Sequence, residues 1–408
     1  MPTINAARVL ADLNRLRDFG RYQTGVHRPS LSAEHNASCH WFAGRMAEAG
    51  LEASFDGIGN VYGVAPGCTR KLLTGSHLES QNYAGWLDGP LGVIYGLEAA
   101  RVINVDPAFA GKGVDVGVWC DEEGHFGHFL GSRSFVDGLS EADIDGAIDR
   151  TDGRKMRDAL GAAGLADEAR RRVKPDEYIG YLEAHIEQGD WLESNNLKLG
   201  VVTSIVGIWQ FKVTFTGAQN HAGTTRMAIR KDAGVALTEL CGAIARRFPQ
   251  VAGPRSVWTT GRITLDPGAP SIIPGRAGLL FQVRDDDPVV LERLERALHE
   301  VVAEADANGP CRFTIETLRK NTPARMSAPF QAALAVAANR HAPDLAVRMP
   351  SGAIHDAQML STVMPAAMMF MPSIGGISHH WSENTADADI VLGARVFASW
   401  AAELLSRA

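Results

Sequence analysis

The stretch Val114-Asp115-Val116-Gly117-Val118-Trp119-Cys120-Asp121-Glu122-Glu123-Gly124 joins a short apolar run to an acidic turn. The same arrangement recurs where residues 72–74 lead to His77 and where residues 178–184 lead to His185. Between the first two runs, residues 90–105 carry apolar side chains at helical spacing after a Gly-Pro start. Strand-like runs that alternate with helical patterns predict an α/β fold, with a mostly parallel sheet covered by helices on both faces.

Residues that commonly bind metals follow these strand-like runs. They are His77, Asp88, Glu122, Glu123, His185 and, near the C-terminus, His379. Because a parallel sheet presents the residues at its strand ends to one crevice, we expect these side chains to lie together. Imidazole and carboxylate groups suit zinc, manganese, cobalt or nickel, and a single Asp can bridge two ions. The pattern therefore predicts one hydrolytic site with two metals.

Each of these signals also has a structural alternative. Asp88 immediately precedes the Gly89-Pro90 helix start, where it could cap the helix. Glu122 and Glu123 point in different directions, which suits one metal ligand and one general base, but a solvated acidic turn is the alternative. A lone His at such a place is more often structural. Five such signals at strand ends together favour a site.

A second pattern begins after residue 206. Residues 211–216 alternate with period two, which is typical of a half-exposed antiparallel strand. Further strands are expected at 256–265, 277–283 and 311–318, and helices at 230–247 and 288–307. After residue 323 the α/β pattern returns and ends in a helix at 388–405. Residues 1–206 and 323–408 are thus predicted to form one domain, with residues 207–322 inserted as an α+β domain.

Composition excludes several classes of protein. A chain of 408 residues favours two domains, and its net charge of -7 gives no basic surface for nucleic acid. No apolar run approaches the roughly 20 residues that span a bilayer, so no membrane partner is expected. The five cysteines are widely spaced and odd in number, and the N-terminus lacks a signal-peptide layout. These features predict a cytoplasmic protein with reduced thiols.

Four segments carry a resemblance that extends over nearly the whole chain. They are HIEQG at 185–189, GAQNHAGTT at 217–225, SGAIHDA at 351–357 and GISH at 376–379. As an ordered set, they resemble the N-carbamoyl-L-amino-acid hydrolase, β-ureidopropionase and allantoate amidohydrolase group of the dinuclear-metal aminoacylase and carboxypeptidase family. The resemblance implies a zinc-exopeptidase-like catalytic domain, and it implies that the inserted domain is a lid and dimerisation domain of a homodimer.

The resemblance also implies a role for each matching residue. It places one divalent ion on His77, Asp88 and His185, and a second on Asp88, Glu123 and His379. It makes Glu122 the general base, while His221 of the inserted domain would reach the active site of the partner subunit and help polarise the scissile carbonyl. The substrate contacts would be Gln188, His221, Ser271, Arg284 and His355, with Arg284 clamping a carboxylate.

Some of these roles and positions leave alternatives open. His221 could instead bond locally to Asn220 or Thr224, and Arg284 could form a surface ion pair with the aspartates at 285–287. Five positions depart from the family pattern without being metal ligands, and they concern substrate choice. Glu79 replaces the usual Asp, Ser271 the usual Asn and Ile354 a Gly, and Trp86 and Gln210 differ as well.

The sequence thus predicts a metal-dependent amidohydrolase for a small-molecule substrate with a carboxylate. It would cleave the linear C–N bond of an N-carbamoyl (ureido) amino acid and give amino acid, carbon dioxide and ammonia. The alternative is an aminoacylase or dipeptidase that uses the same metal site on N-acyl amino acids. Ammonia release from ureido acids, compared with amine release from acylated ones, distinguishes the two. A third possibility, a catalytically silent binding protein on this fold, would be excluded by metal content together with any turnover.

Overall fold

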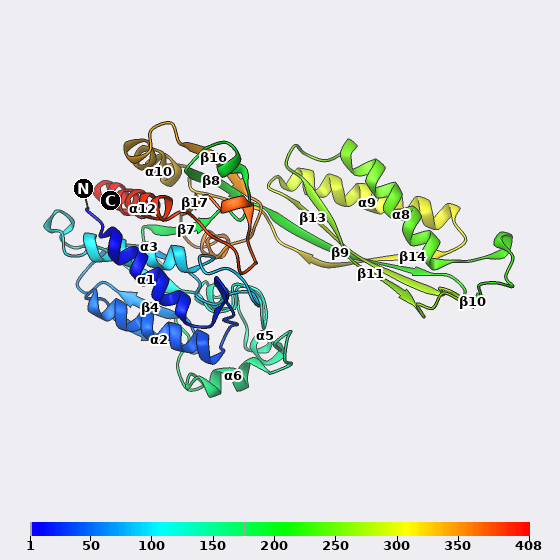
Figure 1. Cartoon of the computed structure of the whole chain (residues 1–408), viewed down its shortest axis with the longest axis horizontal. Coiled ribbons are helices and arrows are strands. Elements are labelled where there is room, and N and C mark those ends of the chain that lie inside the picture. Colours follow the sequence, from blue (N-terminus) through cyan, green and yellow to red (C-terminus); the bar gives the residue numbers. More distant parts are fainter. Residues whose placement is uncertain (1, 175) are drawn as a thin grey trace. The chain divides into compact units, whose positions relative to one another are not determined.

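The computed structural model describes residues 2–174 and 176–408, and the chain divides into two compact units (Figure 1). The first unit contains Met1–Thr203 and Arg325–Ala408, and the second contains Ser204–Ala324. The junctions therefore differ slightly from the expected ones at 206/207 and 322/323. One reason is that the Ser204 hydroxyl donates a hydrogen bond to Asp286 Oδ2 (2.6 Å), which ties Ser204 to the second unit.

Nine strands of the described chain form one mixed sheet centred on the first unit. Their order is β15-β8-β17-β7-β5-β6-β4-β3, and β16 pairs with β8. The strands are β3 (Glu52–Phe55), β4 (Val61–Val64), β5 (Arg70–Ser76), β6 (Lys112–Val118), β7 (Gly180–Ile186), β8 (Leu199–Ile205), β15 (Ala324–Arg325), β16 (Ala346–Ser351) and β17 (Ala366–Met371).

Only the centre of this sheet is parallel, which corrects the prediction of a mostly parallel sheet. Strands β17, β7, β5 and β6 run parallel to their neighbours in this group. Strand β4 is antiparallel to both β3 and β6, and β8 is antiparallel to β17. The connection between β3 and β4 covers only residues 56–60, which is too short for the crossover that parallel strands require.

Helices pack against the central strands. α3 (Pro90–Ile103) contacts β5, β6 and β7, and it is buried on nearly every side because α1 (Ala6–Asp18) and α12 (Asp387–Arg407) also pack against it. The other helices of this unit are α2 (Ala33–Glu48), α4 (Leu130–Phe135), α5 (Glu141–Gly146), α6 (Met156–Ala162), α7 (Trp191–Ser194), α10 (Ala328–His341) and α11 (Asp356–Leu360). The unit also contains the short 3-10 helices η1 (Pro107–Phe109) and η4 (Ile374–Gly376) and a hairpin of β1 (Arg21–Tyr22) and β2 (Gly25–Val26).

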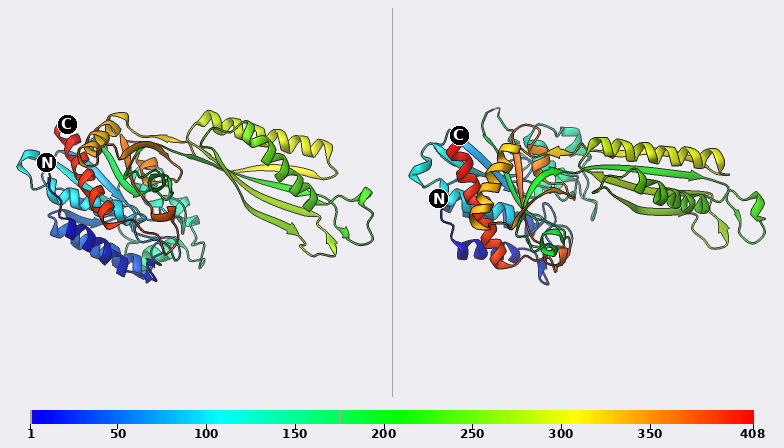
Figure 2. Two further views of the ribbon diagram at one scale, coloured as in Figure 1. Left: turned by 45° about the horizontal axis from the view of Figure 1, so that its top comes forward. Right: turned by 90° about the horizontal axis from the view of Figure 1, so that it is seen from above.

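The second unit is an antiparallel sheet with both of its long helices on one face (Figures 1 and 2). The strand order is β11-β13-β9-β14. The elements are β9 (Gly207–Thr216), β11 (Val257–Asp266), β13 (Arg276–Asp285), β14 (Arg312–Lys320), α8 (Ala233–Arg247) and α9 (Pro288–Asn308). Shorter elements are β10 (Asn220–His221), β12 (Ile272–Ile273), η2 (Met227–Ile229) and η3 (Phe248–Gln250).

Alternation along the strands explains this one-sided packing. Phe211, Val213 and Phe215 of β9 are fully buried, whereas Lys212 between them is exposed. This is the period-two pattern expected from the sequence.

Among residues 2–174 and 176–408, no helix is long and apolar enough to cross a bilayer.

Candidate active site

The carboxyl ends of four neighbouring strands lie level at one edge of the first unit's sheet. Ser76 pairs with Val118 across β5 and β6, and Met371 pairs with Ile186 across β17 and β7. The residues that follow these strands therefore lie close to one another. His185 is the penultimate residue of β7, not a residue that follows the strand.

Five of the predicted metal ligands form two groups that share Asp88. In each group, the ligand atoms of the three residues lie within 4.8 Å of one another. His77 Nε2 and His185 Nε2 lie 3.4 and 3.0 Å from Asp88 Oδ1. His379 Nε2 lies 3.3 Å from Asp88 Oδ2 and 3.7 Å from Glu123 Oε2. Asp88 thus presents one carboxylate oxygen to each group.

Backbone carbonyls orient two of the imidazoles. His77 Nδ1 bonds to the carbonyl of Glu79 (3.1 Å), and His185 Nδ1 bonds to that of Ile186 (2.8 Å). A carbonyl can only accept, so each Nδ1 carries a proton, and in the neutral ring each Nε2 keeps its lone pair. This is the usual arrangement of histidines that bind metals.

The charges of the site also fit a bound cation. Burial raises the pKa of Asp88, but His185, His379 and His77 together hold it well below the usual value. Burial raises the pKa of Glu122 well above its usual range, and the charges of Glu123 and other carboxylates add to this effect while His77 opposes it. Buried carboxylates that crowd in this way need compensating positive charge, which divalent ions supply.

The structural alternatives for Asp88 and the acidic turn are wrong. Helix α3 has Gly89 at its N-cap position without a side-chain cap bond, and Asp88 contacts histidines instead. Gly89 has φ +84°, and a Cβ there would lie 2.5 Å from His77 Nδ1, so only glycine lets this loop pass. Glu122 and Glu123 are only 8% and 6% exposed, so the turn is not solvated.

Two residues that support the site were not predicted from the sequence. Gln81 donates from its backbone N–H to Glu123 Oε1 (3.1 Å) and from its side-chain amide to Oε2 (2.7 Å). Glu383 is buried and accepts a hydrogen bond from the N–H of Asp88 (3.1 Å). Burial and the charge of Asp88 raise the pKa of Glu383 to about 8. Glu383 follows His379 by four residues, but no pattern in the sequence distinguishes it from an exposed Glu.

The structure also brings Gln188 and His355 to the site. The Gln188 amide donates to Asp88 Oδ2 (2.8 Å) and lies 3.2 Å from His379 Nε2. The His355 ring lies 4.5 Å from the ring of His185 between centroids. Burial lowers the pKa of His355 well below its usual value, and the neighbouring His185 lowers it further.

Trp86 and Ile354 lie in different surroundings. Trp86 is buried, and the Arg17 guanidinium lies over its ring at 4.8 Å. It therefore packs against the first helix of the chain. Ile354 is partly buried beside His355.

The second unit holds His221 and Ser271 close together. Strand β10 pairs with β12, so that His221 lies opposite Ile272, and the N–H of Ala222 donates to the carbonyl of Ser271 (2.9 Å). His221 Nδ1 accepts from the N–H groups of Gly223 (3.0 Å) and Thr224 (3.2 Å). The expected local bond is therefore present, and it leaves the proton of a neutral His221 on Nε2.

Arg284 lies in the four-stranded sheet, at the end away from the β10–β12 pair. It pairs with Ile208 at the start of β9, whereas Arg276 pairs with Thr216 at the end of β9. Burial lowers the pKa of Arg284. When the Gln282 amide is oriented with its oxygen toward the guanidinium, it accepts from Arg284 Nε (2.8 Å) and Nη2 (3.2 Å).

The neighbours of Arg284 in the chain make contacts of their own. Asp285 accepts from the Ser256 hydroxyl, and Asp287 caps α9 through the N–H of Val289. In the opposite orientation of the Gln282 amide, its oxygen instead accepts from the Gln210 side-chain amide (2.9 Å). Gln282 therefore lies between Gln210 and Arg284 on the strand face that the helices leave uncovered.

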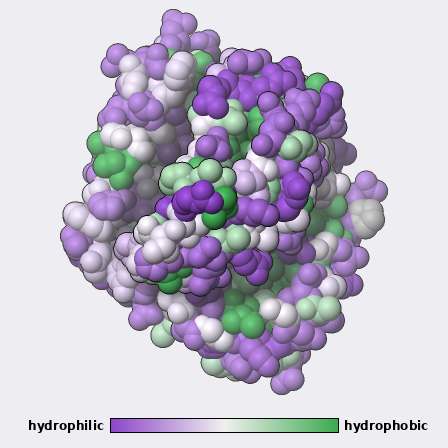
Figure 3. Space-filling model, turned by 90° about the vertical axis from the view of Figure 1, so that its right-hand side faces the viewer, coloured by the Kyte–Doolittle hydropathy of each residue, from purple (hydrophilic) through white to green (hydrophobic). Residues whose placement is uncertain are grey.

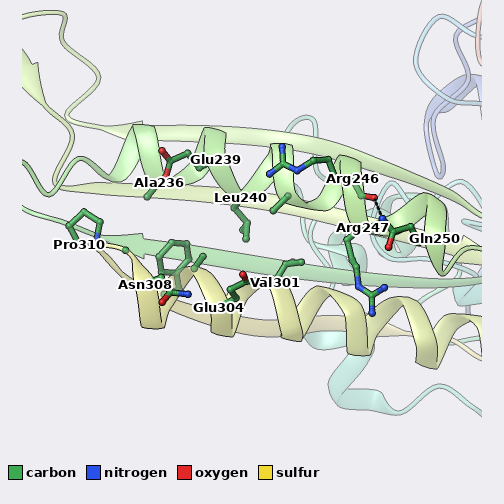
Figure 4. A pocket seen from close by; sticks show the side chains of 14 residues that line it. Ala236, Glu239, Leu240, Arg246, Arg247, Gln250, Val301, Glu304, Asn308 and Pro310 are labelled. Carbon is green, nitrogen blue, oxygen red and sulfur yellow. Dashed lines mark hydrogen bonds between the residues drawn. The ribbon is translucent and has the colours of Figure 1, made fainter.

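A groove of about 620 Å³ lies between α8 and α9 of the second unit (Figure 4). Its walls include Leu240, Ala243, Val301 and Phe313, and the Gln250 amide donates to the carbonyl of Arg246 at its rim (3.1 Å). Within the described residues, the two groups that could hold a metal both belong to the first unit.

Comparisons with known proteins identify the family of the chain. Residues 71–403 match the model of Peptidase family M20/M25/M40. An allantoate amidohydrolase of Escherichia coli (strain K12) is 32% identical, over 92% of each chain. An N-carbamoyl-L-amino acid amidohydrolase of Geobacillus stearothermophilus is 31% identical, over 96% of this chain and 97% of its own. The crystal structure of an amidase (hydantoinase/carbamoylase family) from Burkholderia phymatum is 44% identical, with a TM-score of 0.92, over 100% of this chain and 99% of its own.

These findings confirm the resemblance drawn from the sequence motifs. The fold is the α/β peptidase fold with a mixed sheet, and the relatives are amidohydrolases named for ureido compounds. The chain therefore belongs to Peptidase family M20/M25/M40 and is a hydrolase that acts on linear amide C–N bonds.

Proposed function

We propose that the protein is a metal-dependent amidohydrolase that cleaves the linear C–N bond of N-carbamoyl amino acids to give amino acid, carbon dioxide and ammonia. The observation that carries this proposal is the position of Asp88, whose two carboxylate oxygens each face a separate group of metal-binding side chains. His77, Asp88 and His185 would hold one ion, and Asp88, Glu123 and His379 the other. Bound divalent ions supply Lewis acidity to the scissile carbonyl and acidify the attacking water.

Glu122 is the residue of this site that can move a proton. Its Oε2 lies 3.8 Å from His77 Nε2, and its carboxylate belongs to neither ligand group. Burial and neighbouring negative charge raise its pKa, which favours uptake of a proton from the attacking water. Glu122 would then pass that proton to the leaving nitrogen.

We further propose that the protein acts as a homodimer joined through the second unit. Strand β11 is at one edge of the sheet, spans ten residues and is almost entirely exposed, including Ile263 and Leu265. A long exposed edge strand with apolar side chains is a surface on which another strand can pair. The opposite edge strand, β14, carries four charged residues, which discourage such pairing.

The face shown in Figure 3 gives no support for pairing through an apolar surface. On the face shown in Figure 3, hydrophobic residues lie in small separate patches among hydrophilic ones. A large apolar interface on that face would need a continuous patch.

Distances inside the second unit favour a site built from two chains. From Arg276 to Arg284 the strand advances by eight residue steps, or roughly 27 Å. His221 lies beyond the Arg276 end, because β10 and β12 follow that end of the sheet. One chain therefore cannot bring His221 and Arg284 to the same small substrate. We propose that Arg284 serves its own chain, and that His221 serves the active site of the partner subunit.

A second substrate class is favoured by the relatives. One of the three named above is an allantoate amidohydrolase, so an allantoate-type ureido acid is the alternative substrate. Both classes carry a carboxylate for Arg284 to clamp, with Gln188 and His355 of the same chain as further contacts and Ser271 of the partner subunit as the contact beside His221. The cytoplasmic location expected from the cysteines stays a prediction.

A substrate panel tests the proposal. The protein is loaded with manganese, zinc, cobalt or nickel and incubated with N-carbamoyl amino acids, allantoate and N-acetyl amino acids. The proposal predicts ammonia from N-carbamoyl amino acids. Ammonia from allantoate alone would favour the second class, and amine release from acetylated substrates alone would contradict both.

A further inference from the structure

Glu79 is buried against the backbone of the proposed general base. Its side chain is 0% exposed, and its Oε1 accepts a hydrogen bond from the N–H of Glu122 (2.6 Å). The N–H of Glu123 lies 3.5 Å from the same oxygen. The Glu79 carboxylate therefore contacts the backbone of the acidic turn, where the proposed general base Glu122 is followed by the proposed metal ligand Glu123.

The other carboxylate oxygen faces a histidine of fixed tautomer. His35 Nδ1 accepts from the N–H of Leu31 (3.0 Å), so the proton of the neutral ring is on Nε2. That Nε2 lies 3.5 Å from Glu79 Oε2 and 3.4 Å from Cys39 Sγ. Burial lowers the pKa of His35 to about 4, so the ring is neutral near pH 7. His35 thus turns an N–H toward Glu79, at a distance longer than an ordinary hydrogen bond.

The backbone on either side of Glu79 is held in place. The buried Arg28 donates from Nε to the carbonyl of Leu78 (2.6 Å), and the N–H of Ser80 donates to the carbonyl of Arg28 (2.9 Å). The loop therefore has little freedom to advance toward Glu122. An Asp at position 79 would fall short by one methylene, or about 1.5 Å.

We propose that Glu79 is a positioning residue. The length of its side chain, rather than its charge, fixes the peptide N–H of Glu122 and so determines the position of the general base. This inference rests on the proposed function, because it takes Glu122 as the base. Glu79 is one of the positions where the chain departs from the usual Asp. Its carboxylate does not serve His77 in the contacts above, because His77 Nδ1 bonds to the backbone carbonyl of Glu79.

Two substitutions separate length from charge. Glu79→Gln keeps the reach, and its amide oxygen can still accept from the N–H of Glu122. Glu79→Asp keeps the charge and loses the reach. The matched control is Glu98→Gln, because Glu98 is equally buried but bonds to Arg8 and to the N–H of Asn5, away from the site.

Three quantities are measured on the metal-loaded, full-length protein. They are kcat and KM with the substrate that the unaltered enzyme turns over, bound metal per chain, and hydrogen exchange at the Glu122 amide. We expect Glu79→Asp to lower kcat by about tenfold to a hundredfold, as loss of a supporting hydrogen bond typically does. KM should change by less than about twofold and metal content should hold, because only positioning is lost. The Glu122 amide should exchange faster in Glu79→Asp than in Glu79→Gln, which should stay close to the unaltered enzyme.

Results that would contradict the inference differ from the result that would contradict the proposed function. The inference falls if Glu79→Gln is the more damaging substitution, if metal loss accounts for the whole decrease, or if Glu98→Gln lowers kcat equally. It also falls if the Glu122 amide exchanges at the same rate in all variants. Absence of turnover of any ureido acid by the unaltered enzyme would instead contradict the proposed function, and the exchange measurement would still test the contact between Glu79 and Glu122.

Discussion

The two units of this chain hold their candidate functional residues in different ways. In the first unit, His77 and His185 are buried, oriented by backbone carbonyls and brought together by the ends of adjacent strands. In the second unit, His221 and Ser271 are exposed beyond one end of the four-stranded sheet, and Arg284 lies at its other end. The first arrangement is preorganised, so one unit can assemble the hydrolytic groups. We propose that the second arrangement acts only when it meets a bound substrate and a partner subunit.

The largest expected effect tests whether the first unit holds the hydrolytic groups by itself. Glu122→Gln removes the proposed base without touching either ligand group, so kcat should fall by at least about a hundredfold. Metal content, measured by mass spectrometry, should remain nearly intact. Glu123→Gln is the matched variant and should weaken one metal site instead. If the two substitutions exchanged these effects, the assignment of the pair would be reversed.

A hybrid dimer tests whether His221 of the second unit acts in the active site of the partner subunit. His221→Ala and Glu122→Gln should each be inactive, because each removes one part of a composite site. In an equal mixture, half of the dimers contain both variants, and each of these holds one intact site of two, so about a quarter of full activity should return. Activity is measured after mixing under conditions that allow subunit exchange. Hybrid dimers shown to form but without activity would mean that each site is built from one chain.

A smaller effect is expected at the proposed carboxylate clamp. Arg284→Lys keeps the charge and loses the planar fork, so KM should rise by about tenfold with a smaller change in kcat. Conversion of the substrate carboxylate to an amide should harm the unaltered enzyme greatly and an Arg284→Ala variant little further. Equal rates for acid and amide substrates with the unaltered enzyme would remove this role for Arg284.

The strand ends and their meeting at one site could be predicted because periodicity and topology determine them, whereas the division of the ligands into two groups came from the family resemblance. Parallel strands end at one edge of a sheet, so His77, Glu123 and His185 had to meet if their runs were strands. The inserted unit was also predictable, since residues 211–216 alternate in a way that the first part of the chain does not. The parallel character was overestimated because apolar runs do not reveal the direction of a neighbouring strand.

The supporting contacts could not be predicted from the sequence. Gln81 and Glu383 act through hydrogen bonds to Glu123 and to the backbone of Asp88. Such contacts depend on the path of loops, which no hydrophobic period encodes. Glu79 was noticed only as a departure from a family pattern, and its bond to the N–H of Glu122 emerged from the folded geometry.

The central claim is that Asp88 bridges two metal ions. The most direct measurement is a crystal structure of the manganese- or zinc-loaded protein, with the ions located by anomalous scattering. The account predicts two ions roughly 3.5–4 Å apart, one on each oxygen of Asp88, and the loss of both in Asp88→Ala. Ions located elsewhere, a single ion in the active protein, or full activity of rigorously metal-free protein would contradict it.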